Sequence, residues 1–135
     1  LERLDSFKNE IARRPALTGA IVELDDELQS RLQHFLAKPG PKALFCANGI
    51  TALACTRALK ALGCNLFDDV GLVALDDLDW YPLVGTGITA LAQPTEAIGA
   101  SAFDCLLKRL RGDTAPTRTL DFLPQLIIRG STQRP

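Results

Sequence analysis

Chemically capable side chains gather in one short stretch of this 135-residue chain. Asp76, Asp77 and Asp79 are followed at once by Trp80 and Tyr81, the only tryptophan and the only tyrosine. The carboxylates could bind a metal ion, act as an acid–base pair, or accept hydrogen bonds from ligand hydroxyls. They could also form a plain solvated turn. The aromatic pair could stack on a sugar ring, or one ring could cover a sheet edge as part of the core.

Hydroxyl recognition asks least of the remaining sequence, because it needs only a carboxylate held in place. A hard cation needs about six oxygen ligands, and no second ligand cluster accompanies these acids. The only histidine, His34, is expected on a helix surface and makes no convincing acid–base partner. The chain contains no GxGxxG, GxxxxGK[ST] or GxSxG motif. We therefore predict no metal, no cofactor and no catalysis.

The acids follow an apolar run, Val70 to Leu75, that has the length of a strand. A run that is apolar on both faces is typical of a parallel strand covered by helices on both sides. In open α/β sheets, ligands bind beyond the carboxyl ends of such strands. Asp76 is therefore expected where a polar ligand would be held.

Apolar spacing and end signals predict an alternation of strands and helices along the whole chain. The predicted helices are 2–12, 26–37, 48–62 and 95–111, and the predicted strands are 17–22, 42–46, 70–75, 88–91, 118–122 and 125–129. Asp25 and Asn48 are expected as N-caps, and Gly63 as a left-handed C-terminal residue. The inward residues would be Leu28, Leu32, Phe35 and Leu36; Ile50, Leu53, Ala54, Ala58 and Ala61; and Ile98, Ala102, Cys105, Leu106 and Leu110. This alternation predicts an α/β fold, a mostly parallel sheet flanked by helices on both faces.

Composition indicates a soluble globular chain, with 47% hydrophobic and 23% charged residues. The net charge of -1 gives no bulk attraction to nucleic acid or to an anionic membrane. No apolar run approaches the roughly 20 residues of a membrane span. The chain has no methionine and no signal-like start, so we expect part of a longer or processed protein. Cysteines 46, 55, 64 and 105 lack CxxC spacing and are expected as buried thiols in a reducing cytosol.

Four segments resemble, in order and spacing, the effector-binding core of lac-repressor-family (LacI/GalR) transcription regulators. They are ALFCANGITALACTRALKALG (43–63), DDVGLVALDDLDW (68–80), GITALAQPTEAIGASAFDCLLKRLRG (87–112) and LPQLIIRGST (123–132). The opening Arg3-Leu4-x-x-Phe7 is similar to the R-L-x-G-F segment of that family, with Ser6 where glycine is usual.

The resemblance implies one lobe of a type I periplasmic-binding-protein-like fold, in which two α/β lobes close on a small effector. Residues 1–135 would be the C-terminal lobe of the effector-binding domain. The helix 95–111 would belong to, or contact, the N-terminal lobe. That lobe, the first strand of this one and the helix-turn-helix DNA reader would lie upstream in the parent protein.

The same resemblance implies roles for individual residues. Arg3 matches the arginine that meets effector carboxylates or hydroxyls, and Asp76 the acid that accepts sugar hydroxyls. Asn48 matches the asparagine of an A-N-D segment, although Gly49 replaces the acid. Gln93 matches the Q of the Q-P segment at the lobe hinge. Trp80, which has no set family role, would be a stacking wall near the cleft. Without the resemblance, Asn48 could simply cap a helix and Arg3 could simply cover one.

The resemblance predicts a cytoplasmic, homodimeric effector sensor for a sugar or sugar acid. It would reach operator DNA only through the upstream reader, with the helix 48–62 as the candidate dimer face. A sugar-binding protein of a transport system has the same fold and is the alternative. An enzyme of the same α/β class is the third possibility, and it lacks an identifiable nucleophile or metal cluster.

Overall fold

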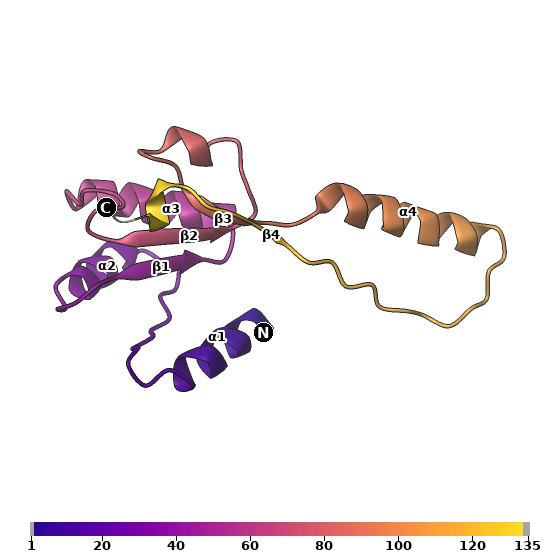
Figure 1. Cartoon of the computed structure of the whole chain (residues 1–135), viewed down its shortest axis with the longest axis horizontal. Coiled ribbons are helices and arrows are strands. Elements are labelled where there is room, and N and C mark those ends of the chain that lie inside the picture. Colours follow the sequence, from indigo (N-terminus) through magenta and orange to yellow (C-terminus); the bar gives the residue numbers. More distant parts are fainter. Residues whose placement is uncertain (1, 134–135) are drawn as a thin grey trace.

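Four strands form one sheet in the order β1-β2-β3-β4 in the computed structural model, which describes residues 2–133 (Figure 1). They are β1 (Ala43–Cys46), β2 (Gly71–Leu75), β3 (Thr89–Ala92) and β4 (Gln125–Ile127). β1, β2 and β3 run parallel, while β4 lies antiparallel to β3 at one edge. This confirms the predicted α/β class with a mostly parallel sheet. Residues 1 and 134–135 of the predicted domain lie outside the described part.

Helices α2 (Leu28–Leu36) and α3 (Gly49–Ala61) pack together and onto one face of the sheet. The predicted inward residues of α2 are confirmed, with Leu28 and Leu32 buried and Phe35 and Leu36 packed beside them. A second cluster joins α3 to β1, β2 and β3, and its buried members are Cys46, Ala52, Phe67, Leu72, Ala74, Tyr81, Ile88 and Ala90. Every second strand residue points into this cluster, as the two-residue period of a strand requires.

The predicted inward stripe of α3 is only partly correct: Ala54 and Ala58 pack against the core, whereas Ile50, Leu53 and Ala61 are exposed. Ala52, Thr56 and Leu59 are the buried residues of the helix, whereas Ile50 is 73% exposed and Leu53 is 37% exposed. Alanines stand on several sides of α3, so apolar spacing does not select one face. The chain that follows β2 instead covers the first turn of α3: a Cβ on Gly49 would lie 2.2 Å from Cδ1 of Leu78.

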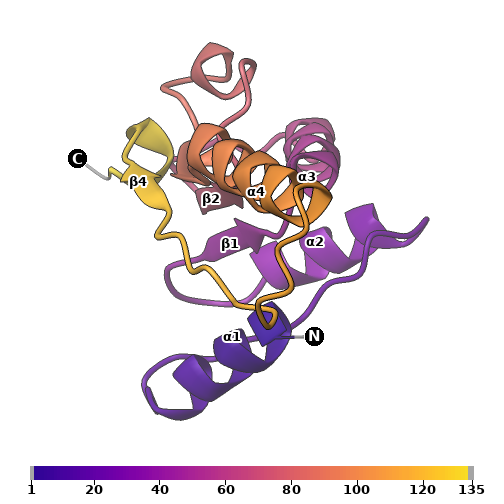
Figure 2. The ribbon, with the colours of Figure 1, turned by 90° about the vertical axis from the view of Figure 1, so that its right-hand side faces the viewer.

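The predicted fold has helices on both faces of the sheet, but the face opposite α2 and α3 is less covered by helices. Phe45 points to that face and is 47% exposed. Helix α1 (Glu2–Ala12), whose bounds match the prediction, lies apart from the strands in both views (Figures 1 and 2). Its apolar side, with Leu4 37% exposed, is only partly covered.

Helix α4 (Thr95–Leu110) extends away from the carboxyl end of β3, and residues 111–124 return to β4 (Figure 1). We call residues 93–124 the arm. No residue of α4 is buried, and its large apolar residues Phe103, Leu106 and Leu110 are 61%, 54% and 74% exposed. The predicted buried face of this helix is therefore wrong for the described structure: Ile98 and Cys105 are only half-buried, the latter beside Arg118, while Leu106 and Leu110 are exposed.

Two predicted strands are absent from the described chain. Residues 17–22 and 118–122 have extended sequence character but no strand assignment. A strand persists when a neighbour satisfies its backbone hydrogen bonds, and neither segment has one among residues 2–133. Asp25 likewise caps no helix: it accepts the backbone N–H of Glu27 at 3.1 Å, and α2 begins at Leu28.

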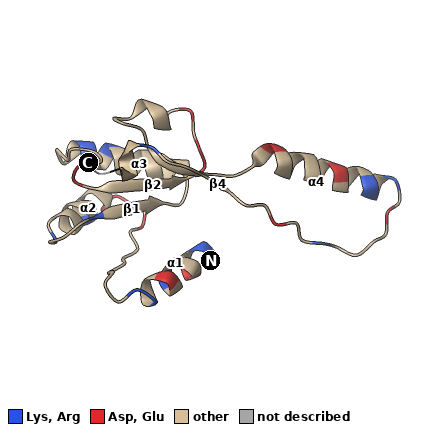
Figure 3. Cartoon of the chain, in the orientation of Figure 1, with Lys and Arg blue, Asp and Glu red and all other residues tan. Residues whose placement is uncertain are grey.

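Acidic and basic residues both occur along α1 and along α4, without one dominant sign (Figure 3). This agrees with the net charge of -1. Within residues 2–133, no helix combines the length and apolarity that crossing a membrane demands.

Candidate functional site

Three of the predicted site residues follow the carboxyl ends of adjacent parallel strands. Asn48 comes two residues after β1, Asp76 directly after β2, and Gln93 directly after β3. The ladders align Cys46 with Ala74 and Leu75 with Leu91, so these ends lie at one edge of the sheet. The sheet thus brings together polar side chains from positions 48, 76 and 93 of the sequence.

Asp76 is the geometric centre of this group. Its backbone has φ +65°, a left-handed conformation that aspartate tolerates better than most residues. Its N–H donates to the carbonyl of Leu91 at 2.9 Å, which extends the contact between β2 and β3 by one residue. Oδ1 accepts the Nε2–H of Gln93 at 2.5 Å. Oδ2 of this half-buried carboxylate takes no part in that hydrogen bond. A carboxylate oxygen can accept a hydrogen bond from a hydroxyl group.

Asn48 forms the predicted cap of α3. Its Oδ1 accepts the N–H of Thr51 at 2.9 Å, and the Oγ1 of Thr51 lies 3.2 Å from the N–H of Asn48. This reciprocal capping box satisfies N–H groups that the first helical turn leaves free. The Nδ2 amide is not part of the box, so capping and ligand contact are compatible in one side chain.

Arg3 reaches the same edge from α1. Its Nη1 donates to the carbonyl of Ala47 at 3.3 Å, directly before Asn48. The structure therefore joins the predicted residues in two pairs, Arg3 beside Asn48 and Asp76 with Gln93. The exposed guanidinium of Arg3 supplies a positive charge at an edge that otherwise carries carboxylates.

Trp80 and Tyr81 divide the two roles considered for the aromatic pair. Tyr81 is fully buried in the core, and its hydroxyl donates to the carbonyl of Leu75 at 3.4 Å. Burial, with the nearby Cys46, Asp76 and Asp77, raises the pKa of Tyr81 to about 12. Trp80 is half-buried and packs edge-to-face on Tyr81, with ring centroids 4.6 Å apart and planes at 89°. One ring is thus core, as the plainer interpretation expects, and the other reaches the surface.

The structure adds a partner that sequence reasoning missed. Arg129 forms a two-pronged ion pair with Asp77, with Nη1–Oδ1 at 2.7 Å and Nη2–Oδ2 at 2.9 Å. The adjacent Asp76 and Asp77 therefore have different partners, since Asp77 is held by Arg129 and Asp76 by Gln93. The only signal for this pair was indirect: Arg129 stands in LPQLIIRGST and Asp77 in DDVGLVALDDLDW, two of the four resembling segments.

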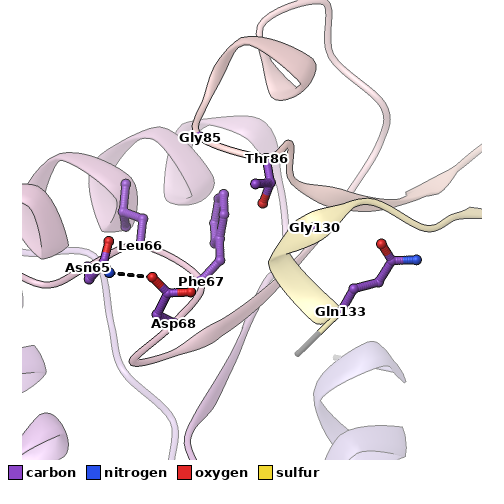
Figure 4. A pocket seen from close by; sticks show the side chains of 8 residues that line it. All are labelled: Asn65, Leu66, Phe67, Asp68, Gly85, Thr86, Gly130 and Gln133. Carbon is purple, nitrogen blue, oxygen red and sulfur yellow. Dashed lines mark hydrogen bonds between the residues drawn. The ribbon is translucent and has the colours of Figure 1, made fainter. Parts of the chain in front are cut away.

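Two surface hollows differ in their relation to this edge. One, of about 520 Å³, adjoins it at the start of the arm and is lined by Gln93, Pro94, Thr95, Glu96, Ala97 and Ala100. The other, of about 480 Å³, lies at the amino ends of β2 and β3, where Asn65 bonds Asp68 beside Phe67 and Thr86 (Figure 4). The second hollow contains none of the predicted residues, so the first is the relevant one.

Neither metal nor thiol chemistry gains support from the described residues. Within residues 2–133, no group of three or more His, Cys, Asp or Glu side chains could hold a metal ion. All four cysteines are free thiols, but only Cys46 is buried, so the expectation of four buried thiols is wrong for Cys55, Cys64 and Cys105. Contact with Cys55 and burial raise the pKa of the Cys46 thiol. The polar residues at the sheet edge can accept hydrogen bonds from a polar ligand and donate hydrogen bonds to it.

Comparison with known proteins gives this geometry a family. Residues 3–132 match the family model of the periplasmic binding protein-like domain. The chain belongs to this family. The periplasmic binding protein-like domain seen here is also 58% identical, over 98% of its length, to the HTH-type transcriptional regulator PtxS of Pseudomonas aeruginosa. It is 36% identical, over 82% of its length, to the HTH-type transcriptional regulator KdgR of Bacillus subtilis.

The chain spans only 39% of the length of PtxS and 33% of KdgR. Among solved structures, a LacI-family transcriptional regulator from Enterococcus faecium with bound ribose shares the fold. Its TM-score is 0.76 at 18% identity, over 96% of this chain and 50% of that one. The family match and the similarity to these regulators agree with the resemblance described from the sequence. The relatives are regulators, which favours this interpretation over a transport protein or an enzyme.

Proposed function

We propose that this chain is the effector-sensing part of a DNA-binding transcription regulator, most simply a repressor. The observation that carries the proposal is the group of polar residues at the carboxyl ends of β1, β2 and β3, in a chain 58% identical to a regulator of transcription. The parent protein would reach operator DNA through a reader domain outside this chain and would act in the cytoplasm.

The proposed effector is a sugar or a sugar acid. Asp76 would accept ligand hydroxyls through its carboxylate, and Asn48 would donate from its amide, which the capping box leaves free. Arg3 would meet a carboxylate or further hydroxyls. Gln93, at the base of the arm, would contact the ligand directly or would hold Asp76 in place through their hydrogen bond. Trp80 would form an apolar wall against which a sugar ring can lie.

Exposure of the arm supports a further part of this proposal. In the parent protein, α4 would cover or join the second lobe of the domain, which explains why Phe103, Leu106 and Leu110 lie open here. Ligand held between two lobes would favour their closed arrangement. A ligand shifts such an equilibrium only by its difference in affinity for the two states.

The test is a thermal-shift screen of the full-length parent against sugars, sugar acids and nucleobases. A ligand that binds only the folded state, at a hundred times its dissociation constant, stabilises by about 2.7 kcal/mol. We expect a sugar or sugar acid to raise the melting temperature of the parent and of Asp79→Asn, and to lose this effect in Asp76→Asn. Asn tolerates the left-handed backbone of position 76, and Asp79 is an exposed acid three residues away.

Two results would count against the proposal. If no compound in these classes stabilises the parent, the effector assignment fails. If a sugar stabilises the parent and Asp76→Asn equally, the ligand binds elsewhere. The charge of the ligand is tested separately: if Arg3→Ala weakens sugar acids and neutral sugars alike, Arg3 does not read a carboxylate.

A further inference from the structure

Arg129 is the most tightly held charged residue near the candidate site. Its Nη1 donates both to Asp77 Oδ1 at 2.7 Å and to the carbonyl of Ile88 at 2.8 Å, while Nη2 donates to Asp77 Oδ2 at 2.9 Å. The side chains of Arg129 and Asp77 are only 19% and 24% exposed. Paired fork geometry of this kind is stronger and more directional than a single contact.

The backbone around Arg129 is held as firmly as its side chain. Thr89 Oγ1 accepts the N–H of Arg129 at 2.9 Å and donates to its carbonyl at 3.0 Å. A Cβ on Gly87, which has φ +89°, would lie 2.7 Å from Cδ of Arg129. Because residue 87 is glycine, the Arg129 side chain can pass close to the backbone just before β3. Arg129 is a rigid support, fixed independently of Asp77.

Asp77 belongs to the segment that presents the candidate site. It directly follows Asp76, and residues 76–80 lead from the end of β2 to the short helix η1 (Tyr81–Leu83). Asp76 needs φ +65° to direct its carboxylate to Gln93, a conformation that requires external support in an L-residue. Asp77 is the nearest residue downstream whose side chain is tied to the sheet.

We propose that Arg129 is a positioning residue of the effector site: by gripping Asp77, it holds the turn in which Asp76 meets Gln93. This inference rests on the proposed function for the identity of the site. Asp76 and Asp77 then have complementary tasks. Asp76 faces ligand and the outgoing strand of the arm, and Asp77 ties the same turn to the strand through which the arm returns. The hydrogen bond with Asp77 also raises the pKa of Arg129, which keeps the guanidinium charged.

The side-chain amide of Gln93 offers a direct readout of this role in the 135-residue chain. Its NMR signals report the hydrogen bond to Asp76, and they can be assigned by their loss in Gln93→Ala. Asp76→Gly removes the side-chain acceptor and adopts the left-handed backbone without steric cost, so it gives the reference position for a broken contact. We expect Arg129→Gln to move the Gln93 signals toward that reference. Arg129→Lys should move them part of the way, because an ammonium cannot reproduce the fork.

Ser131→Ala is the matched control for general loosening of the same segment. Ser131 Oγ accepts the N–H of Thr89 and donates to the carbonyl of Leu72, so its loss weakens the attachment of the C-terminal segment to β2 and β3 without removing a contact to Asp77. Urea unfolding of each variant compares their stabilities. Gln93 signals that stay in place in Arg129→Gln, or that move equally in Ser131→Ala, would overturn the proposal.

These outcomes are independent of the effector screen, since the amide signals are read without ligand. If Arg129→Gln moves the Gln93 amide and no sugar stabilises the parent, the positioning contact exists and the proposed ligand class is wrong. If the amide does not move while Asp76→Asn abolishes sugar stabilisation, the proposed function survives and Arg129 is only structural.

Discussion

Gln93 donates to the Oδ1 of Asp76 over 2.5 Å, and this contact joins the first residue of the arm to the first residue after β2. It makes one carboxylate serve two purposes. Asp76 is the proposed hydroxyl acceptor, and it also holds the point where the chain leaves the sheet. A ligand hydroxyl at Asp76 would meet a residue already engaged with the base of the arm, so binding and arm position share a group.

The left-handed backbone at Asp76 predicts an unusual order of stability among its substitutions. Asp76→Gly and Asp76→Ala both delete the carboxylate, but only glycine adopts φ +65° without steric cost. We expect Asp76→Ala to be less stable than Asp76→Gly by about 1 kcal/mol, the cost of left-handed backbone for an L-residue, less the gain from reduced unfolded-state entropy. Urea denaturation measures the difference. Equal stability, or a more stable alanine variant, would mean that position 76 is not held left-handed.

Asn48 combines a cap with a proposed ligand contact, and substitution separates the two. Asn48→Ala should lower the free energy of unfolding by about 1 kcal/mol, as the loss of an N-cap does. Asn48→Ser keeps an oxygen that can cap and should stay near the stability of the unchanged chain, while losing the amide donor. Urea midpoints test the first statement, and effector affinity in the parent tests the second. A serine variant that binds effector normally would assign Asn48 to capping alone.

Tyr81 is the only tyrosine, so its ionisation can be followed without interference in the near-ultraviolet phenolate absorbance. Its pKa is raised to about 12 from the ordinary 10.0, because burial disfavours the phenolate. The unfolded chain therefore releases this proton first. The stabilising contribution of neutral Tyr81 is complete below pH 10 and is lost as the pH rises from about 10 to about 12.

We accordingly expect the phenolate to appear with a midpoint above 10 in the folded chain and near 10 in denaturant. Tyr81→Phe removes the absorbance change and serves as the control for cysteine and lysine titration in the same range. A folded-state midpoint at the ordinary value would show that the hydroxyl is exposed to water and not buried beneath Trp80.

The two sides of α3 predict opposite responses to truncation. Leu59→Ala removes a fully buried side chain and should cost about 2–5 kcal/mol of folding stability. Ile50→Ala removes one that is 73% exposed and should change stability little. Urea denaturation of the two variants compares them within one helix. A large loss in Ile50→Ala, at concentrations where the chain is monomeric, would contradict the described packing of α3.

The same exposed side is our proposed dimer face in the parent protein. Ile50 and Leu53 stand together on α3, and Leu83 of η1 is 82% exposed. Ile50→Glu should shift the parent toward monomers in sedimentation experiments, whereas Leu106→Glu, on the arm, should leave a dimer through α3 intact. A dimer unaffected by Ile50→Glu would place the interface elsewhere.

Local signals explain why much of the fold could be predicted. The bounds of α1 match the apolar stripe, Asn48 caps α3, and Gly63 adopts φ +72° as expected of a glycine that closes a helix. These features depend on a few neighbouring residues, and so does the placement of Asp76 after a strand. The strand-end rule then brought Asn48, Asp76 and Gln93 to one edge without knowledge of the loops between them.

The errors arise where the outcome depends on distant partners. Apolar spacing cannot tell which side of the alanine-rich α3 faces the sheet, because Leu78, from another part of the chain, decides it. The exposed α4 and the unpaired segment 17–22 are apolar enough to be buried, and burial needs a surface that residues 2–133 do not supply. The pair of Asp77 and Arg129 spans 52 positions and has no period or spacing that could reveal it.

The neck between sheet and arm has mechanical consequences. The arm joins the sheet only through β3 and β4, whose paired ends are Ala92 and Gln125. At 1.5 Å per residue, the 16 residues of α4 form a rod of about 24 Å. A bend of roughly 5° at the two-stranded neck would move the far end of this rod by about 2 Å. Helix α4 thus amplifies small changes at the neck. Asp76 and Asp77 contact the two strands of this neck through Gln93 and Arg129.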